Sequence, residues 1–397
     1  MVLKKIGLAA AVLLAGTQIT YANDLQINGF LSVTAGVLDN EKIIDSPAAP
    51  GYDTTVGFDS QTLGGLQISK KVNDNTSATI QLMSRGKQDY QTEAAWAYVT
   101  YDLSDNTSIR FGRLRTPFFQ YSDFLEVGYA YNWITPPGIV YRLDTMSALN
   151  GVDMTHQFTL GAMDGSFQLF TGRFKDDFDL DGEIYEMELR SAVGAVLNLN
   201  AGNFGTRMSY HQAGFYINGL TADANGRTLD QLFGLAQSFG VQLGLDTSNI
   251  EPQGQTATFF QGSLFWDNGS TSLVAEYTGL RHDSDLLNDD DAWMVSAAQR
   301  FGDFTTHLTY AYAEDKIKSG AIGTAQKFSE AQDSSITLGL RYDYSSSVAF
   351  KTEAHYITTK SSTPRLAELG NQGAAAGDLA LDKNTGSLYT IGMSIVF

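Results

Sequence analysis

Residues 389–397 read YTIGMSIVF, and this last stretch of the chain decides the fold. Every second side chain is large and apolar: Tyr389, Ile391, Met393, Ile395 and Phe397. Thr390, Gly392 and Ser394 stand between them. Alternation with a period of two is typical of a β-strand that has one apolar face. The segment therefore predicts a terminal strand with an apolar face and a polar face.

The same period recurs throughout the chain before this segment. We count sixteen such segments, at residues 24–39, 55–72, 75–86, 91–103, 106–116, 149–160, 165–175, 184–199, 204–217, 256–266, 270–282, 291–301, 304–315, 333–344, 347–360 and 386–397. An even number of antiparallel strands brings both ends of a closed barrel to the same side of a membrane.

Three segments indicate which face meets lipid. In 333–344 and 347–360 the apolar face carries Ile336, Leu338, Leu340, Val348, Phe350 and Tyr356, and the opposite face carries Thr337, Arg341, Lys351, Glu353 and His355. In 184–199 the apolar face carries Leu189, Val193, Ala195 and Leu197, and the opposite face carries Glu186, Glu188, Arg190 and Asn198. A charge on the lipid face costs about 2–4 kcal/mol at mid-bilayer, so we expect the charged faces to line the lumen.

The connections between segments alternate in length. Short ones rich in Asn, Asp, Gly and Ser alternate with long ones at about 40–54, 117–148, 218–255, 316–332 and 361–385, and with shorter members near 87–90, 176–183 and 283–290. Short turns at one rim and long loops at the other are typical of outer-membrane barrels. The sequence therefore predicts an all-β fold, a sixteen-stranded antiparallel transmembrane barrel, wide enough for an aqueous channel.

The N-terminus and the composition agree with export to that membrane. Lys4 and Lys5 precede an apolar run at 6–16, and small residues follow at Thr20 and Ala22, which predicts a signal peptide at 1–22 and a barrel at 23–397. The net charge of −18 argues against nucleic acid as a partner. The chain has no cysteine, which excludes disulfides and thiolate metal sites.

The long connection after the fifth segment carries a resemblance to a known family. Residues 111–118 read FGRLRTPF and are followed by an aromatic loop that extends to residue 148. Together with the segment count and the terminal Phe397, this region resembles the trimeric Gram-negative porins. The PEFGG-like loop motif of enterobacterial members is absent. The resemblance implies a loop folded into the lumen at about 117–148, an outer-membrane location, a homotrimer, and passive diffusion of small hydrophilic solutes.

The resemblance also implies a constriction in which loop acids face basic residues on the wall. The loop acids would be Asp123, Glu126 and Asp144. The bases would be Arg85, Arg110 and Arg115 on the wall, with Arg142 where the loop returns. A transverse field between the two sets would orient dipolar solutes. We expect the loop aromatics, such as Phe118, Phe119 and Trp133, to pack the loop on the wall.

Small side chains on the fourth segment bear on assembly. Ala95, Ala97 and Val99 are predicted to point outward, where small residues would allow close packing between subunits. We expect outer-membrane lipid around the rest of the barrel. No cofactor or metal is predicted, because the acidic runs at 176–181 and 289–291 lack the spacing of a calcium loop and are expected to be solvated.

Four other functions are weighed against a general porin. A substrate-selective channel for a sugar or an organic anion is favoured by the aromatic loop. An outer-membrane enzyme is disfavoured because the five histidines occupy no recognisable catalytic motif; we predict no enzyme activity. A plugged structural barrel would need a plug domain. A soluble β-sandwich would not need the apolar outer face.

Overall fold

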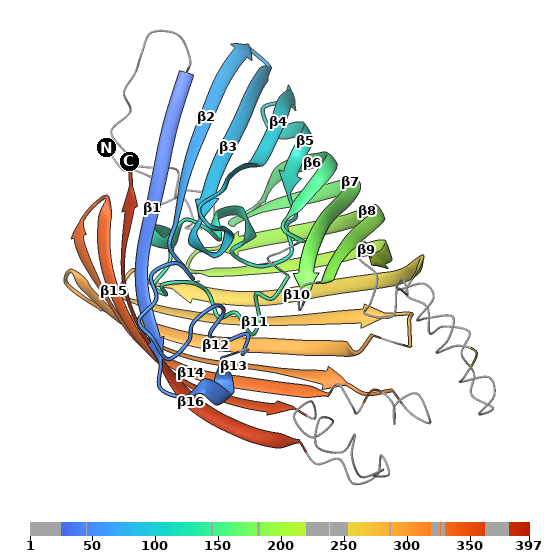
Figure 1. Cartoon of the computed structure of the whole chain (residues 1–397). Coiled ribbons are helices and arrows are strands. Elements are labelled where there is room, and N and C mark those ends of the chain that lie inside the picture. Colours follow the sequence, from blue (N-terminus) through green and yellow to red (C-terminus); the bar gives the residue numbers. More distant parts are fainter. Residues whose placement is uncertain are drawn as a thin grey trace.

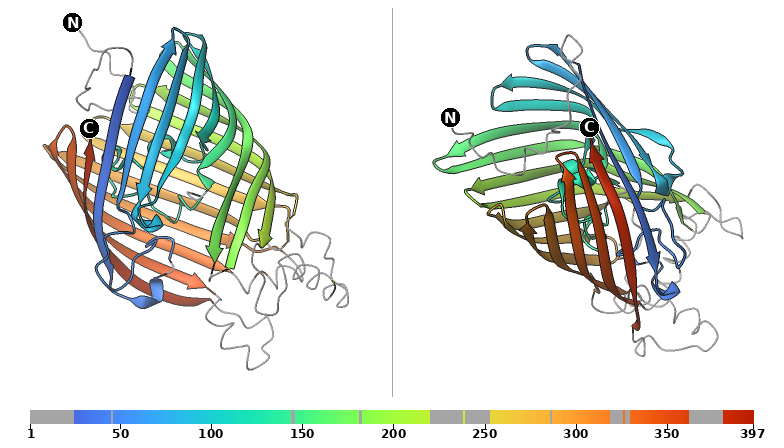
Figure 2. Two further views of the ribbon diagram at one scale, coloured as in Figure 1. Left: turned by 45° about the horizontal axis from the view of Figure 1, so that its top comes forward. Right: turned by 90° about the vertical axis from the view of Figure 1, so that its left-hand side faces the viewer.

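The computed structural model is a closed antiparallel β-barrel of sixteen strands, as the sequence predicts. Each strand pairs with its sequence neighbours, and β1 closes the ring against β16. Figures 1 and 2 show the ring from three sides. The structure describes residues 25–44, 46–143, 146–180, 183–219, 253–285, 287–318, 330–361 and 381–397, with the single residues 238 and 326. The predicted signal peptide at 1–22 lies outside these ranges and stays a prediction.

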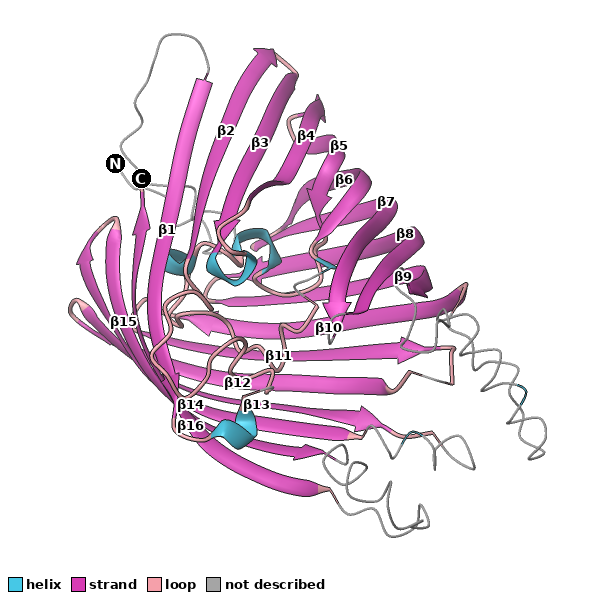
Figure 3. Cartoon of the chain, viewed as in Figure 1, coloured by secondary structure: helices cyan, strands magenta, loops and turns pink. Residues whose placement is uncertain are grey.

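The strands differ widely in length. They are β1 Leu25–Leu38, β2 Leu63–Asn73, β3 Thr76–Arg85, β4 Thr92–Ser104, β5 Thr107–Arg115, β6 Ala148–Leu160, β7 Met163–Leu180, β8 Glu183–Ala201, β9 Phe204–Gly219, β10 Gln255–Asp267, β11 Thr271–His282, β12 Asp289–Phe301, β13 Phe304–Lys316, β14 Ala331–Ser345, β15 Val348–Ser361 and β16 Asp382–Val396. The described short helices are η1 Glu41–Ile43, η2 Gly86–Gln88, η3 Ser122–Phe124 and η4 Gly128–Ala130 (Figure 3). Among the described residues, no helix has the length and apolar character that crossing a membrane requires.

The terminal segment closes the barrel. Phe30 pairs with Val396, and the ladder continues to Leu38 opposite Leu388. Phe397 extends it by exchanging two backbone hydrogen bonds with Gly29, at 2.7 and 2.9 Å. The aromatic ring of Phe397 covers Gly29, where a Cβ atom would lie 2.3 Å from ring carbons. A side chain at position 29 would therefore have to displace the ring of Phe397.

Face assignments from alternation are confirmed in β14 and β15. Leu338 and Tyr356 are exposed on the outside, with exposed fractions of 60% and 52%. Arg341, Lys351 and Glu353 are buried on the inner side. The outer surface is thus apolar and the inner wall carries charge, as a lipid-embedded barrel with a polar lumen requires.

In β8, the predicted inner and outer faces are wrong for the residues that precede Ser191. Ser191 adopts a left-handed φ of 51°, and the pairing with β9 shifts between Arg190 and Val193. This β-bulge inserts one residue and reverses the alternation. Glu188 therefore stands opposite Tyr216 on the outer face, where Arg190 lies 4.0 Å from the centre of the Tyr216 ring.

Charge is tolerated there because β7 and β8 extend beyond the membrane. They contain 18 and 19 residues, and about 9–11 suffice for a tilted strand to span the bilayer. The outer face of the projecting part holds an ion-pair cluster in which Glu188 binds Arg173 and Arg190, and Glu186 binds Lys175. The predicted loop at 176–183 is accordingly wrong over most of its length, since β7 continues to Leu180.

Two further expectations need correction. The second strand begins at Leu63 rather than at residue 55, because residues 55–62 belong to a loop that makes a single bridge, Gly57 to Gly36. In β4, the pairing with β3 shifts by one residue, and Ala95 becomes the extra residue of a bulge. Ala95 is buried against Phe30 and Met83, so it does not point outward as predicted.

The turns and loops separate by side as expected. Gly161, Gly202, Gly269 and Gly302 each have a positive φ in the short turns of one rim. That backbone conformation suits glycine in tight hairpins. The long connections, including 39–62 and 116–147, join strands at the other rim.

Candidate functional site

The described residues of the connection between β5 and β6, 116–143, 146 and 147, leave the wall and fold into the ring of strands (Figure 1), and we call them the inner loop. Their base is tied by a hydrogen bond from the Thr116 N–H to the Ser147 carbonyl oxygen, at 2.7 Å. These residues connect β5, which ends at Arg115, to β6, which begins at Ala148. The constriction role predicted for 117–148 stays a prediction. Contacts with strands on several sides of the barrel, described next, fix the course of this loop.

Aromatic side chains form the core of the inner loop. Phe119 and Tyr141 have ring centres 4.6 Å apart, and Phe118 packs edge-on against Phe259 of β10 at 5.0 Å. Trp133 donates a hydrogen bond from Nε1 to the Thr309 hydroxyl of β13 at 2.8 Å. These rings are buried, as expected for aromatics that pack the loop on the wall.

Three of the predicted constriction residues meet in a buried cluster of two ion pairs. Glu126 accepts from Arg85 Nε at 2.5 Å and from Arg115 Nη1 at 3.0 Å. Arg85 also binds Glu93 of β4. The prediction placed Glu126 across a water gap from the arginines. Instead, the two arginines hold the loop against β3 and β5 and neutralise the charge of Glu126.

The opposite wall grips the loop by its backbone. The Lys351 ammonium of β15 donates to the carbonyl oxygens of Gly128, Tyr131 and Trp133, the second at 2.7 Å. Arg341 of β14 donates to the carbonyl oxygens of Tyr129 and Tyr131, at 2.7 and 2.8 Å. We call Lys351 and Arg341 the carbonyl clamp.

Glu353 completes this contact by accepting the Ile134 N–H at 3.0 Å. Alternation predicts that these three side chains face the lumen, but it does not give their partners. A cation that binds backbone carbonyls leaves no pattern in the sequence. The clamp residues were therefore missed.

A third wall, β9 to β11, holds the root of the loop. Arg207 donates to the Pro117 carbonyl oxygen, and the Ser209 hydroxyl to that of Phe118 at 2.9 Å. Glu276 accepts from the Gln120 N–H at 2.8 Å and from the Tyr141 hydroxyl at 2.5 Å. Burial, followed by the charge of Glu276, raises the pKa of Tyr141 well above its usual value. Tyr141 therefore stays a hydrogen-bond donor at neutral pH.

The remaining predicted residues are dispersed. Arg110 forms a bidentate pair with Asp153 of β6, from Nε at 3.0 Å and Nη2 at 2.5 Å. Asp123 is exposed on the loop and acts electrostatically on Arg110 and on Arg207. Arg142 binds Asp290 of β12. Asp144 lies outside the described residues.

No group of three or more metal-ligating side chains occurs among the residues that the structure describes. The charged side chains described above pair with one another or with the loop backbone. The arrangement is a polar wall with an internal loop attached on three sides, which can restrict and sort solutes in a lumen.

A comparison with protein-family models matches residues 8–362 to the Gram-negative porins. The chain belongs to this family. Its location is therefore the bacterial outer membrane, as the sequence predicts. A comparison with curated proteins gave no match.

Solved structures of outer-membrane proteins share the fold of this porin at low sequence identity. OmpT of Vibrio cholerae, expressed in the outer membrane, has a TM-score of 0.56 at 14% identity, covering 96% of this chain and all of that one. Salmonella typhi OmpF in complex with daunomycin has a TM-score of 0.55 at 14% identity, covering 94% and 98%. An anion-selective porin from Comamonas acidovorans has a TM-score of 0.53 at 14% identity, covering 94% and 99%.

Proposed function

We propose that this porin gives passive diffusion of small hydrophilic solutes and ions through a water-filled lumen that the inner loop narrows. One observation carries the proposal: a closed sixteen-stranded ring has charged side chains on its inner wall and holds a loop inside it by hydrogen bonds to β9–β11 and β13–β15. A barrel of this size leaves an aqueous channel unless something fills it. The proposed function includes no enzymatic step.

Within the constriction we assign the selective charges to Asp123 and to the Arg110–Asp153 pair. Glu126, Arg85 and Arg115 neutralise one another in a buried cluster, so their contribution is to fix the loop. Asp123 is exposed and near Arg110, which keeps an exposed side-chain fraction of 29%. The field that a solute meets would therefore run between these groups. Arg142, which binds Asp290 of β12, would act nearer the mouth.

We further propose a homotrimer in which the outer faces of the first strands are in contact. Ala97 and Val99 pair with Arg113 and Phe111 of β5 in an unbroken ladder, and they remain small residues on the outer face. Gly64 of β2 stands opposite Leu31 on the same side of the barrel. A V. cholerae OmpT structure of the same fold is described as a trimer form, at 13% identity and a TM-score of 0.53.

Planar-bilayer recording tests the channel and the assembly together. A general porin should give ohmic steps of high conductance, grouped in threes per insertion, with no block by micromolar sugars or organic anions. Micromolar block by one such solute would replace the proposal with a substrate-selective channel. A purified protein that folds and inserts but stays closed would contradict both channels.

A further inference from the structure

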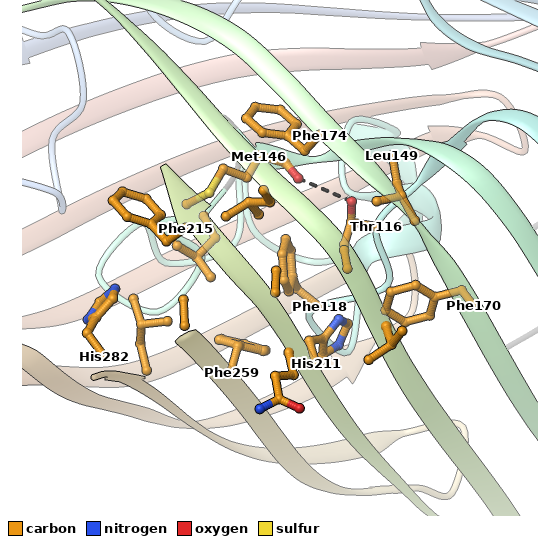
Figure 4. Close-up of a pocket in the computed structure, with 18 residues that line it drawn as sticks. Thr116, Phe118, Met146, Leu149, Phe170, Phe174, His211, Phe215, Phe259 and His282 are labelled. Carbon is orange, nitrogen blue, oxygen red and sulfur yellow. Dashed lines mark hydrogen bonds between the residues drawn. The ribbon is translucent and has the colours of Figure 1, made fainter. Parts of the chain in front are cut away.

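An apolar cavity lies between the root of the inner loop and the wall from β6 to β11. Its volume is about 60 Å³. Figure 4 shows Phe118 of the loop, with Phe170, Phe174, Phe215 and Phe259 of the strands, around it. Such a lining is unusual on the inner face of a barrel, where water and polar groups are the rule.

Water is a poor occupant of this space. By volume the cavity could hold about four waters, at roughly 15 Å³ each, but every ordered water needs two to four polar partners. The hydroxyl of Thr116, which lines the cavity, already donates to the Met146 carbonyl oxygen at 3.2 Å. Most of the other lining residues are apolar, so the cavity favours an apolar group over water.

Two buried polar atoms of the lining residues have no partner, His211 Nε2 and His282 Nδ1. His211 of β9 is buried, with an exposed fraction of 6%, and lies with its ring centre 4.7 Å from that of Phe118 and 5.1 Å from that of Phe170 (Figure 4). The ring donates a hydrogen bond to the Pro117 carbonyl oxygen. Its Nε2 atom is buried and unpaired. With the proton on the other nitrogen, Nε2 is an acceptor.

A buried acceptor without a donor costs about 1–3 kcal/mol. A ligand that places an apolar group among the rings and a hydroxyl or N–H group at Nε2 would remove that cost. The position beside the loop root puts such a ligand at the edge of the permeation path.

We propose that this cavity is a binding subsite for the apolar end of a small amphipathic solute, such as a short-chain alcohol, whose hydroxyl donates to His211 Nε2. The subsite rests on the proposed channel function, because the lumen supplies the solute. It adds selectivity for solutes that carry a short alkyl group to an otherwise polar pore.

The test uses 4,4,4-trifluorobutan-1-ol as the probe and fluorine relaxation as the readout. The intact protein is placed in lipid nanodiscs, and empty nanodiscs measure partitioning into lipid. The wild-type protein should broaden the fluorine resonance of the alcohol beyond the broadening that empty nanodiscs cause, and this excess should be saturable. Ala213→Leu and Ala257→Leu each fill the cavity and should abolish that excess. His211→Phe keeps the ring packing and should weaken binding several-fold.

A substitution on the outer face of the same strand, Met208→Leu, serves as the matched control and should bind as wild type does. Circular dichroism and single-channel conductance establish that each variant is folded and open. Equal binding by wild type and both filled variants would overturn the subsite, as would the absence of any saturable broadening. A wild type that binds the alcohol but does not conduct would instead overturn the proposed channel function.

Discussion

Lys351 is a buried cation whose direct partners in the inner loop are backbone oxygens. Its ammonium donates to the carbonyl groups of Gly128, Tyr131 and Trp133, which belong to the section of the loop farthest from its base. Buried carbonyls that lose their donors cost about 1–3 kcal/mol each, and the desolvated ammonium offsets part of that sum. The side chain therefore sets how firmly the loop is held.

Replacing Lys351 with methionine should loosen the loop without emptying the space. We expect a loss of about 2 kcal/mol in loop attachment, which raises the population of displaced loop positions roughly thirty-fold. Single-channel recordings should then show a noisier open level and frequent transitions to other conductances. Lys360→Met removes the same charge from the same strand, where Lys360 contacts Gln332 instead of the loop, and should leave the trace unchanged. Identical noise in the two variants would contradict this role for the clamp.

Residue-level prediction from the sequence succeeded where alternation alone sufficed. It placed Lys351 and Arg341 on the inner wall, because a strand has only two faces. It did not give their partners, because backbone carbonyls have no sequence signature. Glu126, Arg85 and Arg115 are in contact, but the sequence could not give their separation, because the loop could have stood away from the wall. Their place in a constriction stays a prediction.

At the scale of elements, the β-bulge in β8 is the feature that alternation could not reveal. The strand pattern runs on through Ser191, and only the left-handed φ of 51° at that residue reverses the faces. All sixteen strands were found because their period is local. The end of β7 was not, because polar residues continue a strand once it projects beyond the lipid. The start of β2 was placed at residue 55, although residues 55–62 belong to a loop.

Ser191→Gly should stabilise this bulge. A non-glycine residue in the left-handed region costs of the order of 1 kcal/mol, which glycine does not incur. Glycine also increases the freedom of the unfolded chain, so a net gain of about 0.5 kcal/mol is expected. Equilibrium unfolding in urea from lipid vesicles measures it. Ser296→Gly, in the regular part of β12, should lose stability instead. A loss of the same size at Ser191 would show that the bulge is not strained.

At the scale of the whole molecule, charge pairing limits ion selectivity. The chain carries a net charge of −18, which attracts cations to both mouths. In the narrow part, Glu126 is neutralised by two arginines and Asp153 by Arg110. Asp290 is likewise paired with Arg142. Asp123 is exposed, so it contributes most directly to the field that an ion meets.

A tenfold KCl gradient should therefore give a small reversal potential of cation-selective sign, well below the roughly 59 mV of an ideally selective pore. Asp123→Asn should move it toward zero or to anion-selective values. Asp105→Asn, in an exposed turn at the other rim, should change it much less, because salt at about 0.1 M screens charges beyond roughly 10 Å. A wild-type potential of anion-selective sign would show that Arg110 and Arg207 dominate the constriction. Equal shifts in the two variants would show that total charge decides selectivity, and would remove Asp123 from the site.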